Sequence, residues 1–354
     1  MSTRGNGRRP ATPLGVAVVG LGYWGPNLVR NFFGLEEANV VAVCDRDEAA
    51  LERIAKRYPG IRRTTSVEDV IEDPAVDAVA IATPVSTHYD LARTALAAGK
   101  HAFVEKPLAG SSVQGAELIE LARRAGLVLM PGHTFLYSPP VTLIHELVAS
   151  GELGEIYFIS TSRVNLGLHQ PDASVAWDLG PHDFSILRYW LDEVPTEVAA
   201  WSRGCIIPAT PDVAFINLAF PSGTIAHVEL AWLAPSKLRR TAVVGSQKMV
   251  VYDDTSNEPV RVFDSQAVLR DPETFGEFQL SYRTGDIVSP RVEAVEPLAL
   301  ELQDFCRAVL TGSTPRSNAP LGLDVVRVVE AVEHSLALAG QRVSVESVDP
   351  ALAR

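Results

Sequence analysis

The first third of the chain alternates between short apolar runs and amphipathic stretches. Runs rich in valine, alanine and isoleucine predict strands, whereas apolar residues that recur every three or four positions predict helices. The predicted strands are residues 15–20, 40–45, 77–82, 101–104 and 127–130, and the predicted helices are residues 24–34, 47–58, 67–72, 87–98 and 111–125. This alternation is typical of a parallel sheet with helices on both faces, an α/β architecture. Ligands of such sheets bind beyond the carboxyl ends of the strands.

The pattern changes at about residue 132, after which long runs alternate apolar and polar side chains. The predicted strands here are 155–164, 196–206, 212–220, 223–233, 239–245, 248–252 and 259–264, and the predicted helices are 139–150, 297–311 and 321–339. Turn residues between several of these strands favour a large, open and mostly antiparallel sheet. We therefore predict two domains, residues 14–131 and 132–354, that follow a disordered tail at 1–13. One face of an open sheet needs cover, which favours a homodimer or homotetramer formed through this sheet.

Composition and charge narrow the class of protein. Of 354 residues, 47% are hydrophobic and 21% are charged, and the net charge is −12. This acidic balance argues against nucleic acid or an anionic membrane as a partner. No apolar run approaches the ~20 residues that cross a bilayer, and the polar N-terminal segment lacks the apolar stretch of a signal peptide. Three scattered cysteines fit a reducing cytoplasm, and no cluster of residues has the spacing of metal ligands.

A glycine-rich turn follows the first predicted strand. Gly20, Gly22 and Gly25 have the spacing G-x-G-x-x-G, with Tyr23 and Trp24 between the last two, and a helical pattern follows directly. In a dinucleotide site the first glycine permits a tight turn, the second lets the backbone approach a pyrophosphate, and the third lets helix and strand pack closely. The N–H groups at the helix start then hold the phosphate charge. Strand, turn and helix together predict a dinucleotide cofactor.

The end of the second predicted strand indicates which cofactor this is. Asp45 stands at about the distance from Gly20 expected of the acid that binds the ribose hydroxyls. A carboxylate there repels a 2′-phosphate, so NAD is favoured over NADP. The neighbouring Arg46 keeps NADP open, because a guanidinium beside the ribose could pair with that phosphate.

Two further strand ends carry candidate residues. Glu105 and Lys106 directly follow the strand at 101–104, and a lysine in this position faces the cofactor crevice, where it can act as a base or donate a hydrogen bond to substrate oxygen. Thr83 and Pro84 end the strand at 77–82, and His88 begins the next helix, where it could face the nicotinamide ribose. The alternatives are a surface lysine in a loop and a plain helix-capping segment.

The segment from residue 177 to 183 carries an imidazole and two carboxylates. Pro181 suits the first turn of a helix, which would place His182 among the first helical residues. The positive end of the helix dipole would then favour a neutral imidazole, as a general base for an alcohol proton requires. Asp178 could accept a hydrogen bond from this ring or from a substrate hydroxyl. The alternative is a buried histidine beside a helix cap.

The long loop after the strand at 155–164 is a candidate for binding. Arg163 could pair with a carboxylate or phosphate, and Asn165 could bond hydroxyls. The loop continues through His169, and a solvent-exposed loop without a function remains the alternative. His133 and Tyr137 are interpreted mainly as core residues that could also line the pocket.

Taken together these motifs resemble the glucose–fructose oxidoreductase / inositol dehydrogenase family, also called Gfo/Idh/MocA. The matching segments are residues 20–25, 82–88, 105–107 and Asp178 with His182. The resemblance implies an N-terminal Rossmann domain, a C-terminal α/β domain built on an open sheet, and hydride transfer between a nicotinamide cofactor and a carbohydrate or polyol carbon. It also implies that Lys106 holds the reacting hydroxyl, that His182 is the acid/base, and that Asp178 orients the substrate or the histidine.

Within this family the chain most resembles the nucleotide-sugar 3-dehydrogenases, on the segments 22–27, 132–137, 163–167 and 177–183. That resemblance implies oxidation at C3 of a UDP-linked amino sugar or its uronic acid, with Arg163 and Asn165 in contact with sugar or diphosphate. The chain has Leu136-Tyr137-Ser138 where many members carry an arginine shortly before the Pro139 position. The alternatives are an NADPH-dependent keto-sugar reductase, an inositol or polyol dehydrogenase, and a cofactor-binding regulator without turnover.

Overall fold

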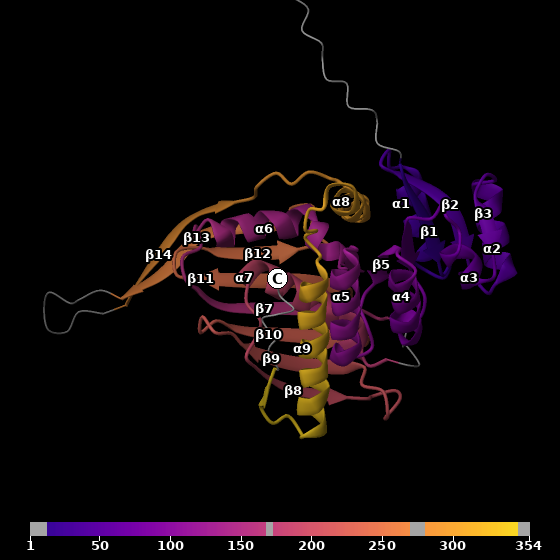
Figure 1. Cartoon of the computed structure of the whole chain (residues 1–354). Helices are drawn as coiled ribbons and strands as arrows, with labels where there is room; N and C mark the ends of the chain where they lie inside the picture. Colours follow the sequence, from indigo (N-terminus) through magenta and orange to yellow (C-terminus); the bar gives the residue numbers. More distant parts are fainter. Residues whose placement is uncertain (1–12, 168–172, 270–279, 346–354) are drawn as a thin grey trace, which may run out of the picture. The chain divides into compact units, whose positions relative to one another are not determined.

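The computed structural model describes residues 13–167, 173–269 and 280–345 (Figure 1). The predicted disordered tail, apart from Pro13, and His169 lie outside these residues. The chain forms two compact units. The first comprises residues 1–108, 117–132 and 298–318, and the second comprises residues 109–116, 133–297 and 319–354.

The first unit is built on a six-stranded parallel sheet with the order β3-β2-β1-β4-β5-β6. Its strands are β1 (Leu14–Val19), β2 (Ala38–Cys44), β3 (Arg62–Thr64), β4 (Ala78–Ile81), β5 (His101–Glu105) and β6 (Leu129–Gly132). This order reverses direction between β1 and β4, which is the doubly wound Rossmann arrangement that binds dinucleotides at the switch point. The predicted parallel sheet is therefore confirmed. The exposed three-residue strand β3 was not predicted.

Helices alternate with these strands. They are α1 (Gly25–Phe33), α2 (Glu48–Arg57), α3 (Val67–Ile71), η1 (Val85–Thr87), α4 (His88–Ala97) and α5 (Ser112–Ala125), whose first turn belongs to the second unit. A seventh helix, α8 (Pro297–Thr311), comes from far along the chain. It belongs to this unit because the buried ring of Phe305 packs edge-on against Phe32 of α1 and Phe103 of β5.

The second unit contains a nine-stranded sheet with the order β14-β13-β12-β11-β7-β10-β9-β8-β15. Its strands are β7 (Ile156–Val164), β8 (Glu197–Arg203), β9 (Val213–Ala219), β10 (Ile225–Ala231), β11 (Leu238–Gly245), β12 (Met249–Asp253), β13 (Val260–Leu269), β14 (Leu280–Val288) and β15 (Val343–Ser344). The pair β7–β10 is parallel, and the other pairs are antiparallel. A mostly antiparallel open sheet was predicted and is confirmed, although β14 and β15 were missed.

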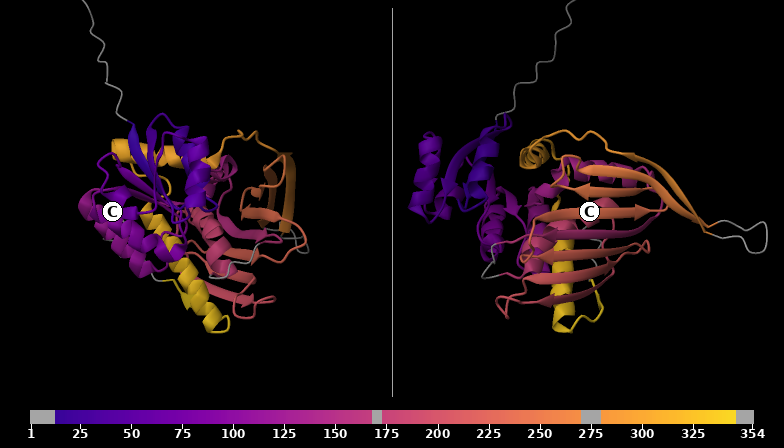
Figure 2. Two further views of the ribbon diagram at one scale, coloured as in Figure 1. Left: turned by 90° about the vertical axis from the view of Figure 1, so that its right-hand side faces the viewer. Right: turned by 180° about the vertical axis from the view of Figure 1, so that it is seen from behind.

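One face of this sheet is covered by helices. These are α6 (Pro139–Ala149), α7 (Val175–Leu191) and α9 (Ala319–Ala337), and a short helix η2 (Thr134–Tyr137) precedes α6. In the view from behind, the strands face the viewer and α9 lies on their far side (Figure 2). The covered face carries alternate buried residues, for example Ala214, Ile216 and Leu218 along β9. Burial of such side chains contributes roughly 25 cal/mol per Å² of apolar surface.

The opposite face of the sheet carries a continuous apolar row. Residues paired directly across strands share a face, and the pairings connect Ala219, Ile225, Phe158, Val244, Met249, Phe263 and Ile287 across seven strands. Ile225 is 59% exposed and Ile287 is 63% exposed. We call this set the open-face row.

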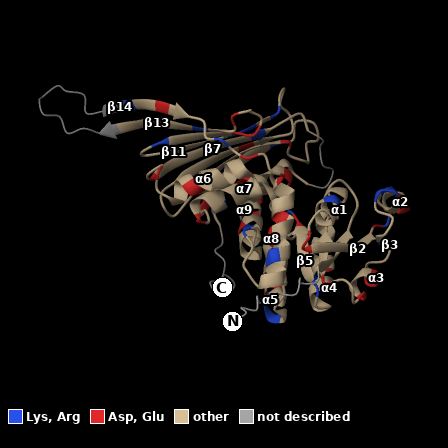
Figure 3. Ribbon diagram, turned by 90° about the horizontal axis from the view of Figure 1, so that it is seen from above, with Lys and Arg blue, Asp and Glu red and all other residues tan. Residues whose placement is uncertain are grey.

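Charged residues of both signs are interspersed along the elements of each unit (Figure 3). Several form exposed ion pairs, such as Arg123 with Glu120 on α5, and pairs of this kind contribute little to stability. Within the part of the chain that the structure describes, no helix is both long and apolar enough to cross a membrane.

Candidate functional site

The glycine turn has the geometry that a dinucleotide requires. Gly20 has φ +91°, a conformation that side chains other than hydrogen rarely adopt. A Cβ on Gly25 would lie 2.0 Å from the carbonyl oxygen of Gly20, so only glycine lets α1 begin this close to β1. A Cβ on Gly22 would meet nothing within 4 Å. The backbone at Gly22 is thus open to an approaching ligand.

Asp45 is fixed beside this turn. Its Oδ2 accepts a hydrogen bond from the backbone N–H of Leu21 at 2.5 Å, and its Oδ1 accepts one from Asp47 at 2.8 Å. The neighbouring Arg46 is exposed. At the start of α1 the N-cap residue, Trp24, makes no side-chain capping bond. Pro26 has no N–H, and the Asn27 N–H donates to the Trp24 carbonyl oxygen at 2.9 Å. In the first turn of α1 this leaves the backbone N–H of Gly25 to meet a pyrophosphate.

The exposed part of the turn is aromatic. Tyr23 is 84% exposed and packs edge-on against Trp24, which is itself 40% exposed. Large exposed rings are costly in water and are therefore suited to cover a bound nucleotide. Both residues lie between Gly22 and Gly25, where the sequence placed the cofactor.

Two loops follow β4 and β5 at the same edge of the sheet. After β4, the Thr87 hydroxyl donates to Thr83 Oγ1 at 2.7 Å and lies 2.8 Å from the carbonyl oxygen of Pro84. His88 is buried, and its two ring nitrogens each lie 2.9 Å from a carbonyl oxygen, Nδ1 from Pro107 and Nε2 from Thr83. The ring of His88 therefore spans from one loop to the other.

Glu105 and Lys106 lie where β5 ends. The carboxyl group of Glu105 is buried, and burial raises its pKa to about 7 against the opposing effects of Lys106 and a backbone hydrogen bond. Its Oε1 has no hydrogen-bond partner among the described residues, although a buried polar oxygen normally has one. Lys106 is partly buried, and the Lys106–Pro107 peptide bond is cis. β4 separates β5 from β1 in the sheet, and all three strands end at the edge where a dinucleotide binds in such a fold.

The second set of candidates lies on α7 in the other unit. This helix begins at Val175, capped by the Ser174 hydroxyl, and Pro181 lies in its interior. The expected helix start at Pro181 is therefore wrong, and His182 stands two turns inside the helix. Because the helix dipole acts only over the first turn, it does not explain a neutral imidazole at His182.

The His182 ring contacts an aromatic ring over which two arginines lie. The ring packs edge-on against Phe135, with ring centres 4.9 Å apart. The guanidinium groups of Arg163 and Arg239 lie over the Phe135 ring at 4.6 Å and 5.5 Å from its centre. Phe135 thus connects the imidazole to two cations. Sequence reasoning missed Phe135 because an apolar residue in a short helix carries no chemical signal.

Arg163 is not an exposed loop residue but part of a buried ion pair. Its Nε donates to Asp183 Oδ2 at 2.6 Å and its Nη2 donates to Asp183 Oδ1 at 3.3 Å. The side chains are 7% and 4% exposed. Burial acts to lower the pKa of Arg163, but Asp183, together with Tyr252 and Asp254, outweighs burial and the pKa is raised. The predicted contact of Arg163 with substrate remains untested, and two of its three nitrogens are already in use.

Two threonines extend this ion pair across the sheet. The Thr161 hydroxyl on β7 donates to Asp183 Oδ1 at 3.0 Å, and the Thr241 hydroxyl on β11 lies 3.0 Å from Thr161 Oγ1. Asp183 immediately follows His182 in α7. The network therefore ties this point of the helix to two strands.

Asp178 lies one turn before His182, and residues four apart share a helix face. Its Oδ2 accepts a hydrogen bond from the indole N–H of Trp232 at 3.1 Å. A Cβ on Gly167 would lie 3.1 Å from both Trp232 Cδ1 and Asn165 Oδ1. Asp178, Trp232 and Asn165 thus lie close to one another. Trp232 was not predicted, since nothing in its local sequence separates it from a core tryptophan.

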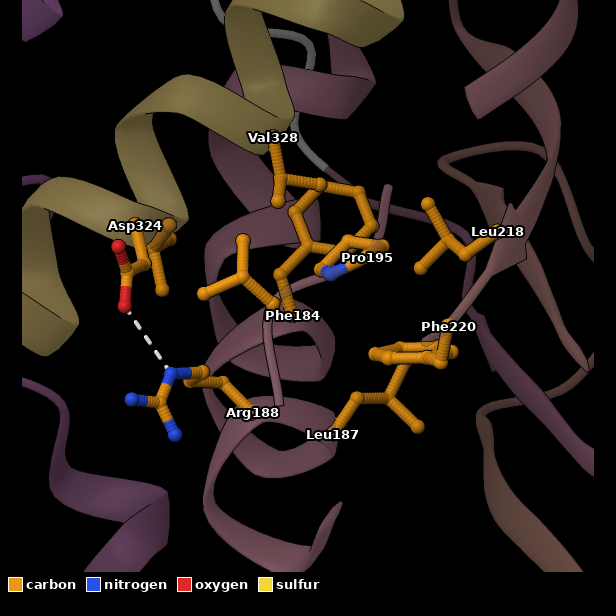
Figure 4. A pocket seen from close by; sticks show the side chains of 10 residues that line it. Phe184, Leu187, Arg188, Pro195, Leu218, Phe220, Asp324 and Val328 are labelled. Carbon is orange, nitrogen blue, oxygen red and sulfur yellow. Dashed lines mark hydrogen bonds and ion pairs between the residues drawn. The ribbon is translucent and has the colours of Figure 1, made fainter. Parts of the chain in front are cut away.

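The remaining sequence candidates lie in the interior. His133 directly precedes η2 and Tyr137 is its last residue, and they are 1% and 3% exposed. A small pocket in the same unit is lined mainly by apolar side chains and by the Arg188–Asp324 ion pair (Figure 4). None of the residues predicted for the site lines it. Among the described residues no group of three His, Cys, Asp or Glu side chains could hold a metal ion.

The doubly wound sheet, the open glycine turn and the fixed Asp45 define a dinucleotide-binding oxidoreductase. Comparison with protein families agrees. Residues 14–133 match the Gfo/Idh/MocA oxidoreductase model, described as an NAD-binding Rossmann fold, and residues 141–251 match the model of the C-terminal domain of the same family. Together these matches cover well over half of the chain, which belongs to the Gfo/Idh/MocA family.

Several relatives are dehydrogenases of inositols or sugars, and one is a hydratase, 2,7-anhydro-N-acetylneuraminate hydratase. The chain is 27% identical over 314 residues to scyllo-inositol 2-dehydrogenase (NAD(+)) of Bacillus subtilis, which covers 84% of this chain and 87% of that protein. Its structure is similar to GenD2 from gentamicin A biosynthesis in complex with NAD, with a TM-score of 0.80, 26% identity and coverage of 98% and 100%. UDP-N-acetylglucosamine 3-dehydrogenase GnnA from Acidithiobacillus ferrooxidans shares the fold, with a TM-score of 0.77, 21% identity and coverage of 94% and 100%.

Proposed function

We propose that this protein catalyses the reversible, NAD-dependent oxidation of a secondary alcohol on a ring, in a cyclic polyol or a sugar. The observation that carries the proposal is the coexistence of an open dinucleotide turn beside Asp45 with a helix face that presents Asp178 and His182. A protein that only sensed the cofactor would need the turn and not this second set. The names of two relatives, both inositol dehydrogenases, support the same class of reaction, and the NAD bound to GenD2 supports the cofactor.

The roles of the residues follow from their chemistry. Bound NAD would supply the acceptor for the hydride. Lys106 would hold the reacting hydroxyl and assist its loss of a proton, and His182 would take that proton as general base. Asp178, held by the Trp232 indole, would orient the substrate or the imidazole. Gly20, Gly22 and Gly25 would hold the pyrophosphate.

The substrate itself can be argued from charge. Oxidation at C3 of a nucleotide-linked amino sugar is one candidate, and it was expected to use Arg163 for the diphosphate. Arg163 pairs with Asp183, and Arg239 pairs with Asp254 at 3.1 Å, so the two cations near His182 are neutralised by two anions. With Asp178 one turn before His182, the charged side chains near His182 have no excess of positive charge, which favours an uncharged ring over a substrate with a diphosphate. We therefore place a free cyclic polyol or sugar ahead of the nucleotide-linked sugar.

A substrate panel tests this proposal. The purified full-length protein would be assayed for cofactor reduction with scyllo-inositol, myo-inositol, free hexoses and UDP-N-acetylglucosamine, each with NAD and with NADP. We expect turnover with an uncharged ring and NAD. Turnover confined to UDP-sugars would reverse the order of the two substrates, and preference for NADP with keto-sugar reduction would favour the reductase alternative.

Variants test the assigned residues. Lys106→Ala and His182→Ala should each lower turnover by roughly 10²-fold, as loss of general acid–base help does, while NAD binding measured by calorimetry is retained. Exposed residues of the same types, Lys56→Ala and His334→Ala, serve as matched controls. Wild-type turnover in both site variants would refute the assignment.

We further propose that a second copy of this chain covers the open-face row. The row spans seven strands, or roughly 29 Å at about 4.8 Å per strand, and large exposed apolar patches mark interaction surfaces. Phe158→Glu should dissociate the oligomer in sedimentation experiments, whereas Val113→Glu, at an exposed apolar residue of α5, should not. A monomeric wild-type protein would refute this proposal.

A further inference from the structure

The ring of His88 lies between two segments that follow neighbouring strands. β4 and β5 pair in parallel, so the loops that follow them leave the same edge of the sheet. Nε2 of His88 is 2.9 Å from the carbonyl oxygen of Thr83, after β4, and Nδ1 is 2.9 Å from the carbonyl oxygen of Pro107, after β5. The residue before Pro107 is Lys106. The ring is 1% exposed, so water cannot replace either contact.

The two contacts require more protons than a neutral ring carries. Both partners are carbonyl oxygens, which only accept hydrogen bonds. A neutral imidazole has one N–H and one lone pair, whereas an imidazolium has two N–H groups. A neutral His88 can therefore hold one of the two carbonyls, and a protonated His88 can hold both.

Opposing effects act on the pKa of the His88 imidazole. Burial lowers the pKa of His88, the carbonyl groups of Pro107 and Thr83 raise it, and the charge of Lys106 lowers it, with a net decrease. Among the described residues, Lys106 is the charged group that acts on the ring. The second hydrogen bond is thus expected to form only as the pH falls below about 6.5, the ordinary value for histidine.

We propose that His88 is a positioning residue for Lys106: its ring ties the segment that carries Lys106 to the end of the neighbouring strand, and its protonation sets whether one or both carbonyls are held. The proposal rests on the role given to Lys106 above. It does not require His88 to touch the substrate or the cofactor.

Removing the donors while keeping the shape of the ring tests the tie. In His88→Phe, hydrogen–deuterium exchange over residues 105–110 should become faster, and kcat should fall about tenfold while the Kd for NAD changes less than threefold. His88→Gln, which can donate to one carbonyl, should recover part of both losses. Nitrogen-15 NMR of the imidazole rings, with His88 assigned by its absence in His88→Phe, should show one protonated nitrogen at neutral pH and two at lower pH.

The control is His101→Phe in the same unit. His101 stands at the other end of β5, where its Nδ1 accepts from the backbone of Val128, so exchange over residues 105–110 and kcat should keep their wild-type values. Unchanged exchange in His88→Phe would overturn the proposal, and so would an unchanged kcat in His88→Phe if Lys106→Ala lowers turnover. The exchange measurement needs no turnover, so it decides the tie even if Lys106→Ala proves fully active and the proposed role of Lys106 fails.

Discussion

The buried Arg163–Asp183 pair leads us to predict how single substitutions change the free energy of unfolding through lost charge compensation. Asp183→Asn keeps the shape of the side chain and its hydrogen bond from Thr161, but it leaves a buried guanidinium without a counter-charge. Arg163→Met leaves a buried carboxylate instead. Removing one partner of a buried pair costs about 3–5 kcal/mol, so each single variant should lose an amount in this range of its free energy of unfolding.

The double variant should be more stable than either single variant. With Arg163→Met and Asp183→Asn combined, no uncompensated charge remains, and replacement of a buried pair by neutral residues is often close to neutral. We expect a loss of about 1–2 kcal/mol. Four of the five tryptophans, at residues 177, 190, 201 and 232, lie in the second unit. Tryptophan fluorescence during urea unfolding therefore reports mainly on the unit that carries the pair.

The coupling free energy between Arg163→Met and Asp183→Asn tests whether charge compensation stabilises the pair. If charge compensation holds the pair, the double variant should be at least ~3 kcal/mol more stable than the sum of the two single losses predicts. If the losses simply add, the pair acts through packing alone, and the argument from buried charge is refuted.

We make three further predictions, which concern a buried carboxyl group, the glycine turn and the hydrogen bond to Asp178. Burial raises the pKa of Glu105, so between pH 4.5 and about 7 the folded protein holds a proton that the unfolded chain releases, and stability falls over this range. Glu105→Gln should therefore be more stable than wild type by up to about 3 kcal/mol at pH 8. It should show no gain at pH 4, as measured by thermal unfolding without cofactor. Gly25→Ala should lower stability by about 1–3 kcal/mol, whereas Gly22→Ala should leave the melting temperature unchanged and weaken NAD binding in calorimetry. Equal melting temperatures for the two variants would refute this contrast. Trp232→Phe should remove the hydrogen bond to Asp178 and raise KM for the ring substrate, and an unchanged KM would contradict the role of Asp178.

Much of the fold could be predicted from local patterns. The parallel sheet follows from apolar runs that alternate with helical periodicity, and the glycine turn is identifiable because three glycines stand between a strand and a helix. What local pattern cannot show is partnership across long sequence distance. The packing of Phe305 against Phe32 and Phe103, which brings α8 to the first unit, has no local signal. The edge strands β3 and β15 are also too short to show a period.

The candidate site was predicted unevenly for the same reason. The three glycines of the turn and Asp45 can be identified from their spacing, because their roles depend on the backbone conformation near one turn. Arg163 was predicted to bind the substrate because the local sequence shows no partner for its positive charge. In the structure Arg163 pairs with Asp183, twenty residues later, and its contact with substrate stays a prediction. A sequence without contacts cannot distinguish a cation held in reserve for a ligand from one already paired.

The start of α7 shows how one misplaced boundary changes a chemical argument. A proline followed by a histidine suggests a first helical turn, but Ser174 begins the helix one and a half turns earlier by accepting from Trp177. A dipole that acts over one turn cannot reach His182. Phe135 contacts the imidazole edge-on, and two arginines lie over the same aromatic ring. Each arginine is paired with an aspartate, so the surroundings of His182 are set by tertiary contacts and not by the position of the residue in its helix.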